Sequence, residues 1–208
     1  MRLYTYWRST TAYRIRIALN LKGIAYEPVP INLVDGEQTT TSYKALNPIA
    51  GVPALELDEG AILTQSMAIL EYLEDQYPEP TFLPDDPVES ANIRAAAMIV
   101  ASDIHPINNL KVGKKLKELG HAQDEVIDWM LDWMARGFEA YQALLPDAQF
   151  SFGQQPTMAD ICLVPQLYNA HRWGLDLAPF TRLTEIETRC LVLPAFAVAR
   201  PENQPDAI

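Results

Sequence analysis

The sequence predicts an α/β domain over residues 1–80, followed by an all-α domain over residues 87–208. Segments with the apolar spacing of strands and of helices alternate through the first domain, which is typical of α/β proteins. Four prolines then fall within the eleven residues 77–87, a composition that indicates a linker. Beyond this linker the strand-like alternation disappears, and apolar side chains recur at helical spacing.

The first domain is expected to open as strand, helix and strand. Residues 3–6 alternate between two faces, as a half-buried strand does. The side chains of Tyr13, Ile17 and Leu21 then share one helical face. A second strand is predicted over residues 24–31, which completes a βαβ unit.

The rest of the first domain is expected to hold a short helix, a hairpin and a longer helix. The short helix is predicted just before Leu46. Residues 54–57 and 61–63 flank a turn at 58–60, which indicates a β-hairpin. Ser66 is expected to cap the longer helix. The predicted apolar stripe of that helix is Met67, Leu70 and Leu73, with Ile69 beside them.

The second domain is predicted to consist of helices. The first is expected over residues 88–117, with Pro106 as a kink or a break. Thr157 and Asp160 form a capping box at the start of another, which is expected to run to about residue 172. The polar tail 203–208 is expected to be loose. The remaining helices are predicted at residues 124–145, 183–190 and 194–199.

The composition is that of an acidic globular protein. Of the 208 residues 49% are hydrophobic and 21% are charged, and the net charge of −11 argues against nucleic acid as a partner. Cys162 and Cys190 each lie in an apolar stretch, so we expect buried free thiols and no metal site. No apolar run approaches about 18 residues, and the chain begins with a strand. We therefore expect a soluble cytoplasmic protein without a signal peptide or membrane span.

Three hydroxyl side chains, Ser9, Thr10 and Thr11, lie where the first strand meets the first helix. A helix N-terminus has free N–H groups and the positive end of a dipole, and both favour anions. One interpretation is that one of these hydroxyls caps the helix. The other is that a hydroxyl donates to a bound thiolate and lowers the pKa of that thiol. Three hydroxyls exceed what a cap needs, and the residues alone leave both interpretations open.

Three arginines, Arg8, Arg14 and Arg16, lie close together in this acidic chain. An anionic ligand would explain them. A helix face whose arginines form ion pairs is the alternative, which we expect to hold for at least one of Arg14 and Arg16.

The run WRSTTAYRIRIALNLKG resembles the signature of the zeta-class glutathione transferases, usually written S-S-C-x-W-R-V-R-I-A-L. Ser9 and Thr10 fall on its two serines, and Thr11 replaces its cysteine. Because that cysteine is not the obligatory nucleophile of the family, the replacement leaves the implied chemistry intact. Similar motifs cover nearly the whole chain: PINL (30–33), ALNP (45–48), VPAL (52–55), QSMAILEYLE (65–74), DIHPINNL (103–110), TMADICLVPQ (157–166) and NQPD (203–206).

The resemblance implies the glutathione transferase fold, a thioredoxin-like N-terminal domain plus an all-helical domain, with glutathione as the cofactor. Pro53 would be cis, so that Val52 can pair its N–H and C=O with the extended tripeptide. Gln65 and Ser66 would hold the γ-glutamyl carboxylate at a helix N-terminus, and Gln38 would contact the glycyl end. A trans Pro53 and a plain cap at Ser66 are the structural alternatives.

The same resemblance implies which groups stabilise the thiolate of glutathione. Ser9 is the leading donor, with Thr10 and Thr11 as alternates. Lowering a thiol pKa by about 2 units needs about 2.7 kcal/mol, roughly what one hydroxyl hydrogen bond and a helix N-terminus supply. His105 and Asn109 would assist. His105 is also His in similar bacterial maleylpyruvate isomerases, and the alternative is that it has a structural role on its helix.

The implied reaction is glutathione-dependent cis–trans isomerisation of a maleyl-type enedione acid. The thiolate would add to the cis double bond, and its expulsion after rotation would leave the trans isomer. Arg8 and Arg172 would hold the substrate carboxylates, and their separation in sequence means that they meet only across a cleft between the domains. Lys111 is the third residue expected to bind substrate, and it falls where the maleylpyruvate isomerases carry an arginine pair. That departure weakens the case for maleylpyruvate, so we expect maleylacetoacetate as the substrate. Isomerisation of maleylpyruvate and a general zeta-class glutathione transferase activity are the alternatives.

The resemblance also implies a homodimer. A function of another class stays open, that of a non-catalytic binding module with this fold. Retention of Ser9 between a cation and a helix N-terminus argues against that alternative.

Overall fold

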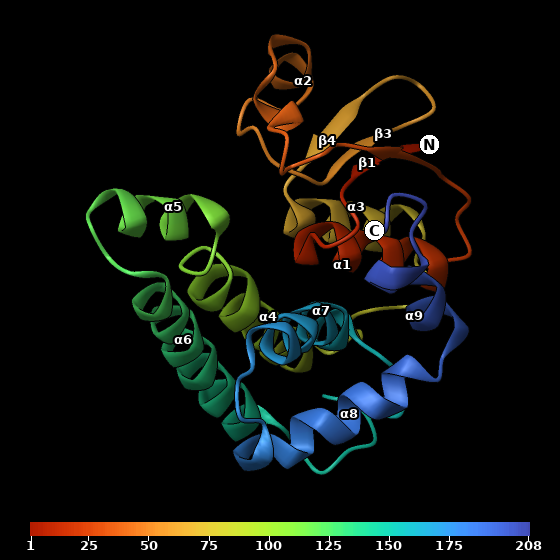
Figure 1. Ribbon diagram of the computed structural model, residues 1–208. Helices are drawn as coiled ribbons and strands as arrows, with labels where there is room; N and C mark the ends of the chain where they lie inside the picture. The colour runs from red at the N-terminus through yellow and green to blue at the C-terminus, as the bar shows by residue number, and fades with distance from the viewer. The chain divides into compact units, whose positions relative to one another are not determined.

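The computed structural model describes residues 1–208, which form two compact units. The first holds Met1–Thr81 and Leu191–Ile208, and the second holds Phe82–Cys190. The first unit is built on a sheet and the second is helical, so the predicted α/β and all-α folds are confirmed (Figure 1). We assigned the C-terminal residues to the helical domain, whereas the segment Leu191–Ile208 packs with the first unit.

The sheet of the first unit has the strand order β2-β1-β3-β4. Its strands are β1 (Arg2–Thr5), β2 (Glu27–Pro30), β3 (Ala54–Glu56) and β4 (Ile62–Thr64). β1 pairs in parallel with β2 and antiparallel with β3, which pairs antiparallel with β4. In this register Leu3 lies opposite Leu55, and both are fully buried. The predicted βαβ unit and hairpin are confirmed, although β2 is shorter than the strand expected over residues 24–31.

Helices lie on both sides of this sheet (Figure 1). They are α1 (Thr10–Leu21), α2 (Thr41–Leu46), α3 (Ser66–Gln76) and α9 (Pro194–Ala199). α1 packs against α3 and α9, and its Tyr13 and Ile17 are buried as predicted. On α2, Tyr43 packs edge-on against Tyr4 of β1, with ring centroids 6.0 Å apart. The sheet is therefore covered on one face by α1 and α3 and on the other by α2.

The start of α3 differs from the prediction. Gln65 is the N-cap residue, and its side chain makes no capping hydrogen bond. Ser66 is instead the first helical residue, and it is buried together with Leu70 and Leu73. Met67 is only half-buried, so Ser66 takes the place that we predicted for Met67 in the stripe. This change turns the Ser66 hydroxyl toward the interior.

The helices of the second unit are α4 (Pro87–Met98), α5 (Leu110–Glu118), α6 (Gln123–Leu144), α7 (Met158–Trp173) and α8 (Thr181–Leu191). The long helix predicted over residues 88–117 is broken at Pro106, which has no N–H to donate. Before the break, α4 passes into a π-helical segment, η2 (Ile99–Ile104). Gly137 of α6 permits η2 to approach, because a Cβ there would lie 2.3 Å from the Ile104 side chain. None of these helices is apolar enough over the necessary length to cross a membrane.

The predicted capping box at the start of α7 is confirmed. Asp160 is fully buried, and its carboxylate accepts from the Thr157 N–H at 2.8 Å and the Ser151 N–H at 2.9 Å. Burial raises the pKa of Asp160, and these hydrogen bonds oppose that rise. Cys162 and Cys190 are buried free thiols, as predicted. Burial raises the pKa of the Cys190 thiol, so this residue is not a reactive nucleophile.

The prediction of a loose C-terminal tail is wrong. The Gln204 side-chain amide donates to the backbone carbonyls of Val198 and Arg200, each at 2.9 Å. The Asp206 carboxylate accepts from the Trp7 N–H at 2.9 Å. The tail therefore returns to the loop that joins β1 to α1.

Arg16 of α1 is fully buried and surrounded by hydrogen-bond acceptors. Its guanidinium donates to the carbonyls of Ala199 and Trp7 at 3.0 Å and to the Thr5 hydroxyl at 3.1 Å. Arg14 is buried as well, so neither arginine lies on an exposed helix face. A charged group is stable in the interior only when it is hydrogen-bonded or paired. These acceptors therefore fix the β1–α1 loop against α1 and α9.

Replacing Arg16 with Met would leave several buried acceptors without a donor. We expect Arg16→Met to lower the free energy of unfolding by about 3–5 kcal/mol in urea denaturation. The matched control is Arg136→Met, because Arg136 is exposed and pairs with Asp132 at 2.9 Å along α6. That control is expected to lose about 0.5 kcal/mol or less. A loss below about 1 kcal/mol for Arg16→Met would contradict the role of its guanidinium in holding the loop.

Candidate active site

The three hydroxyls at the start of α1 have different environments. Ser9 is the N-cap residue, and its Oγ accepts from the Ala12 N–H at 3.2 Å. Thr10 is only 4% exposed, whereas Ser9 and Thr11 are half-buried with their side-chain oxygens 2.9 Å apart. Capping uses a lone pair of the Ser9 oxygen and leaves its proton to be donated elsewhere. The two interpretations of this cluster are therefore compatible.

The segment before β3 has an open backbone edge beside these hydroxyls. The peptide bond between Val52 and Pro53 is cis, as predicted. The Val52 N–H makes no hydrogen bond within the chain, and its C=O accepts from Thr11 Oγ1 at 2.8 Å. A carbonyl oxygen has two lone pairs, so it accepts a second donor. Val52 can thus offer both its N–H and its C=O to an extended peptide.

Positive charge gathers at the start of α3. Gln65 is exposed and has a φ of +69°, a conformation that is uncommon for residues other than glycine and is found at functional sites. The first N–H groups of α3 have no side-chain cap. The Ser66 hydroxyl accepts from Arg14 at 3.1 Å, so its own proton points elsewhere. A guanidinium, a hydroxyl and a helix N-terminus therefore meet at one point, which suits a carboxylate.

The role of Arg14 beside Ser66 was not predicted. The two residues are 52 positions apart, and only the packing of α1 on α3 brings them together. The one signal in the sequence was an arginine on a largely apolar helix of an acidic chain.

Gln38 lies on a 3₁₀ turn, η1 (Glu37–Thr39), away from the contacts just described. Its amide N–H donates weakly to the Leu33 carbonyl at 3.4 Å, and its buried Oε1 accepts no hydrogen bond. The amide of Gln38 is therefore only partly engaged by the protein.

Arg8 stands directly before Ser9. Its guanidinium lies over the Trp7 ring, 4.3 Å from the centroid, and forms no ion pair. The Trp7 backbone is held by Asp206 at its N–H and by Arg16 at its C=O. Arg8 therefore carries a positive charge on a fixed backbone, without a carboxylate to neutralise it.

In the second unit, His105 and Asn109 bound the turn between η2 and α5. The His105 N–H donates to the Val100 carbonyl at 3.0 Å, which closes the π-helical segment. Asn109 is the N-cap of α5, and its Oδ1 accepts from the Lys111 N–H at 3.1 Å. Asn109 thus has a structural role in the helix, and its side-chain N–H₂ group stays available as a donor.

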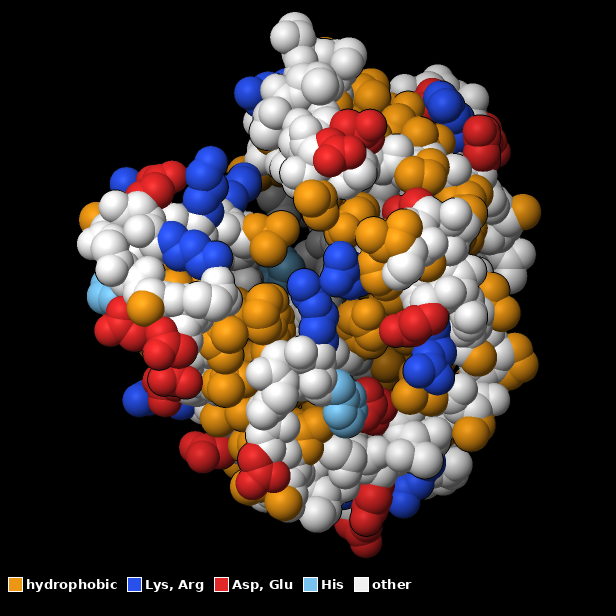
Figure 2. Space-filling view, viewed as in Figure 1, with side chains coloured by type: hydrophobic (Ala, Val, Ile, Leu, Met, Phe, Trp, Pro, Cys, Tyr) orange, Lys and Arg blue, Asp and Glu red, His pale blue; other side chains and the backbone are white.

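The exposed face of α5 is a lysine cluster (Lys111, Lys114, Lys115 and Lys117). These are four of the six lysines in a chain whose net charge is −11. All four are exposed, and Figure 2 shows cationic side chains gathered over α5. Of the four, only Lys111 was predicted as a site residue. The concentration of lysine in one helix is the sequence signal for this cluster.

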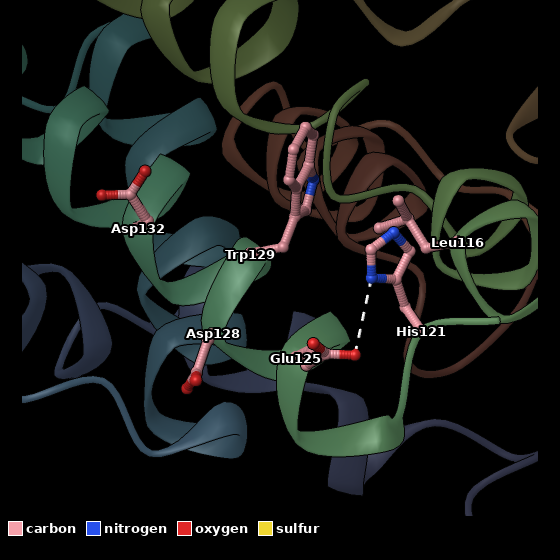
Figure 3. Close-up of a pocket in the computed structure, with 6 residues that line it drawn as sticks. All are labelled: Leu116, His121, Glu125, Asp128, Trp129 and Asp132. Carbon is pink, nitrogen blue, oxygen red and sulfur yellow. Dashed lines mark ion pairs between the residues drawn. The ribbon is translucent and has the colours of Figure 1, made fainter. Parts of the chain in front are cut away.

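The apolar side of α5 faces α6 across a surface hollow (Figure 3). The Trp129 indole N–H donates to the Ile107 carbonyl at 3.4 Å, and His121 lies 3.5 Å from Glu125. Three carboxylates line this hollow, so its charge does not suit an anionic ligand. We interpret the hollow as part of the support that holds α5 and the preceding turn. It is lined by Leu116, His121, Glu125, Asp128, Trp129 and Asp132.

Arg172 lies in the last turn of α7. It is exposed and stacks on Trp173, with the guanidinium 4.7 Å from the ring centroid. The neighbouring His171 bonds to Glu187 at 2.8 Å and so ties the end of α7 to α8. Arg8 and Arg172 belong to different units. No group of three or more His, Cys, Asp or Glu side chains is placed to hold a metal ion.

Two family models match the chain. Residues 1–75 match the N-terminal domain of glutathione S-transferase, and residues 124–189 match its C-terminal domain.

Along its whole length the chain is similar to maleylacetoacetate isomerases and to maleylpyruvate isomerases. It is 46% identical to the maleylacetoacetate isomerase of Pseudomonas aeruginosa, over 99% of this chain and 98% of that protein. A holo structure of maleylpyruvate isomerase, a bacterial glutathione S-transferase of the zeta class, is 44% identical, with a TM-score of 0.97 and complete coverage of both chains. The maleylacetoacetate isomerase of Anaeromyxobacter dehalogenans 2CP-1, with glutathione bound in its active site, is 44% identical. Its TM-score is 0.90, over 100% of this chain and 97% of that one.

Proposed function

Because the chain belongs to the glutathione S-transferase family, in the zeta class that includes the maleylacetoacetate isomerases, we propose that it isomerises maleylacetoacetate to fumarylacetoacetate with glutathione as its cofactor. This reaction is a step of tyrosine and phenylalanine breakdown. The observation that carries the proposal is the Ser9 hydroxyl at the N-terminus of α1, which two hydrogen bonds connect to the open backbone of Val52. A thiol held along that backbone would lie beside groups that favour its thiolate form.

The residues of the first unit fit glutathione, an anionic tripeptide. Val52 offers an unbonded N–H and a C=O for the peptide backbone. Ser66, with Arg14 behind it and uncapped N–H groups around it, suits the γ-glutamyl carboxylate. Gln65 would contact the same end, and Gln38 would contact the glycyl end.

Bound glutathione supplies a thiolate that adds reversibly to the cis double bond and so permits rotation about it. Ser9 donates a hydrogen bond to the sulfur, and the positive end of α1 favours the charged form. Thr10 is buried and Thr11 already donates to Val52, which supports Ser9 as the main donor. His105 adds a second donor when its imidazole is neutral.

The substrate is a dianion, and its carboxylates need cationic partners. Arg8 carries an uncompensated charge beside Ser9, and Arg172 is an exposed cation at the end of α7. Lys111 begins the lysine cluster. Maleylpyruvate is the alternative substrate, since relatives of both names are similar to the chain at 44–46% identity. We also propose that the chain forms a homodimer and acts in the cytoplasm.

The test is isomerisation of maleylacetoacetate and of maleylpyruvate by the wild type, with and without glutathione. We expect turnover only with glutathione, and a higher kcat/KM for maleylacetoacetate. Ser9→Ala is expected to lower kcat by about 100-fold, because it removes the thiolate donor.

The control for Ser9→Ala is Thr40→Ala, since Thr40 caps α2 as Ser9 caps α1, through a bond from the Tyr43 N–H. Loss of that cap is expected to lower stability by about 1 kcal/mol and to leave kcat unchanged. A higher kcat/KM for maleylpyruvate would change only which acid is assigned as the substrate. Absence of turnover of either acid would overturn the proposal and favour a non-catalytic module.

Ser66→Ala tests the carboxylate site at the start of α3. We expect the KM for glutathione to rise about tenfold with little change in kcat, because a hydrogen bond to a charged group is lost from ground and transition states alike. The matched control is Ser90→Ala on α4, where a buried hydroxyl donates to the Pro84 carbonyl at 2.7 Å. That variant is expected to lose stability without a change in KM. An equal rise of the KM for glutathione in both variants would contradict the assignment of Ser66 to the carboxylate site.

The lysine cluster is expected to attract the dianionic substrate to an otherwise acidic protein. The variant Lys114→Gln/Lys115→Gln/Lys117→Gln should lower kcat/KM about 3–10-fold at low ionic strength. At about 1 M salt, where charges are screened beyond about 3 Å, the difference from the wild type should nearly vanish. Steady-state kinetics over a salt series measures both effects.

The control for the lysine variant makes the same change in net charge elsewhere on the surface. Lys44→Gln/Arg136→Gln/Arg200→Gln removes three exposed cations outside α5. Its kcat/KM is expected to stay within about twofold of the wild type. An equal loss in the two variants would show that net charge matters and that the position of the lysines does not.

A further inference from the structure

Two hydroxyls and a carbonyl form a chain of hydrogen bonds at the start of α1. Thr11 Oγ1 lies 2.8 Å from the Val52 carbonyl, which has no proton to give, so Thr11 is the donor. A hydroxyl carries one proton, so the 2.9 Å contact between Ser9 Oγ and Thr11 Oγ1 uses the proton of Ser9. Donation therefore runs from Ser9 to Thr11 to Val52.

This direction of donation limits how Ser9 can act as a donor to a thiolate. The Ser9 proton points at Thr11, so it has to turn before it can point at a sulfur. Thr11 in turn is committed to the Val52 carbonyl, which is also the acceptor open to the N–H of an extended peptide. One carbonyl thus connects the binding of a peptide backbone with the orientation of two hydroxyls.

We propose, on the basis of the glutathione site proposed above, that Thr11 is a positioning residue that couples peptide pairing at Val52 to thiolate stabilisation by Ser9. A peptide N–H that donates to the Val52 carbonyl competes with Thr11 for the electron density of that oxygen and weakens the Thr11 bond. The Thr11 O–H then turns to Ser9 Oγ, and the Ser9 O–H turns to the sulfur. Each hydroxyl keeps its own proton and no covalent bond changes.

The turned arrangement uses the full hydrogen-bonding capacity of Ser9. Its oxygen accepts from the Ala12 N–H and from Thr11 on two lone pairs, while its single proton is donated to the sulfur. Hydrogen bonds accepted by a hydroxyl polarise it and make it a stronger donor. Both hydroxyls are half-buried, which strengthens this polarisation relative to bulk water.

The test is the pKa of the thiol of bound glutathione, followed by the ultraviolet absorbance of the thiolate in the wild type and in variants at both positions. Thr11→Val keeps the shape and removes the hydroxyl, and we expect it to raise the thiol pKa by about 1 unit, a tenfold loss of thiolate below that pKa. Thr11→Ser keeps the hydroxyl and is expected to stay within about 0.3 units of the wild type. Ser9→Ala/Thr11→Val should match Ser9→Ala alone, because Thr11 acts only through Ser9.

A second measurement separates this role from a merely structural one. S-methylglutathione has no ionisable thiol, so its affinity in calorimetry should change by no more than about twofold in Thr11→Val. Failure of the wild type to bind S-methylglutathione would overturn the proposed function and the role of Thr11 with it. Binding by the wild type, together with an unchanged thiol pKa in Thr11→Val or with shifts that add in the double variant, would overturn the role of Thr11 alone.

Discussion

The first unit depends on the burial of the Arg16 guanidinium. A charge in the interior is stable only if its donors are satisfied, and here the acceptors include the Trp7 carbonyl before the site and the Ala199 carbonyl at the end of α9. Satisfying one side chain therefore fixes two segments that are nearly 200 residues apart in sequence. Asp206 adds a contact from the tail to the same loop. The position of Ser9 therefore depends on hydrogen bonds that are made in the core.

α1 and its N-cap carry most of the groups of the proposed glutathione site that belong to the first unit. Ser9 caps it, Thr11 reaches Val52 from its first turn, and Arg14 reaches Ser66 at the start of α3. Arg16, two residues further along, holds the helix against the loop that precedes it. Because these side chains leave one rigid element, their relative positions are set by helical geometry and not by loop conformation. A flexible scaffold would have to order each of them separately upon binding.

Periodicity and local signals predicted much of this structure. The strands, the hairpin, the hydroxyl cap of α1 and the capping box at Asp160 each depend on residues within a few positions of one another, although the sequence did not decide which of the three hydroxyls is the cap. The cis peptide bond before Pro53 was predicted from the family resemblance. The pairing of Arg14 with Ser66 and the anchoring of the tail by Asp206 were not predicted, because the partners meet only after packing. The Gln65 cap was missed because backbone conformation decides it, with no bond from the side chain.

The two groups of cations act over different ranges because their environments differ. Arg14 is buried and donates to Ser66, so little salt screens its field at that contact. The lysine cluster is exposed, and each of its charges is weakened by mobile ions within about 8 Å at physiological ionic strength. Such a cluster contributes little to a defined contact, yet its summed field acts before any contact forms. In an acidic protein, positive charge of the first kind suits a fixed contact with a carboxylate, and positive charge of the second kind suits attraction of an anion from solution.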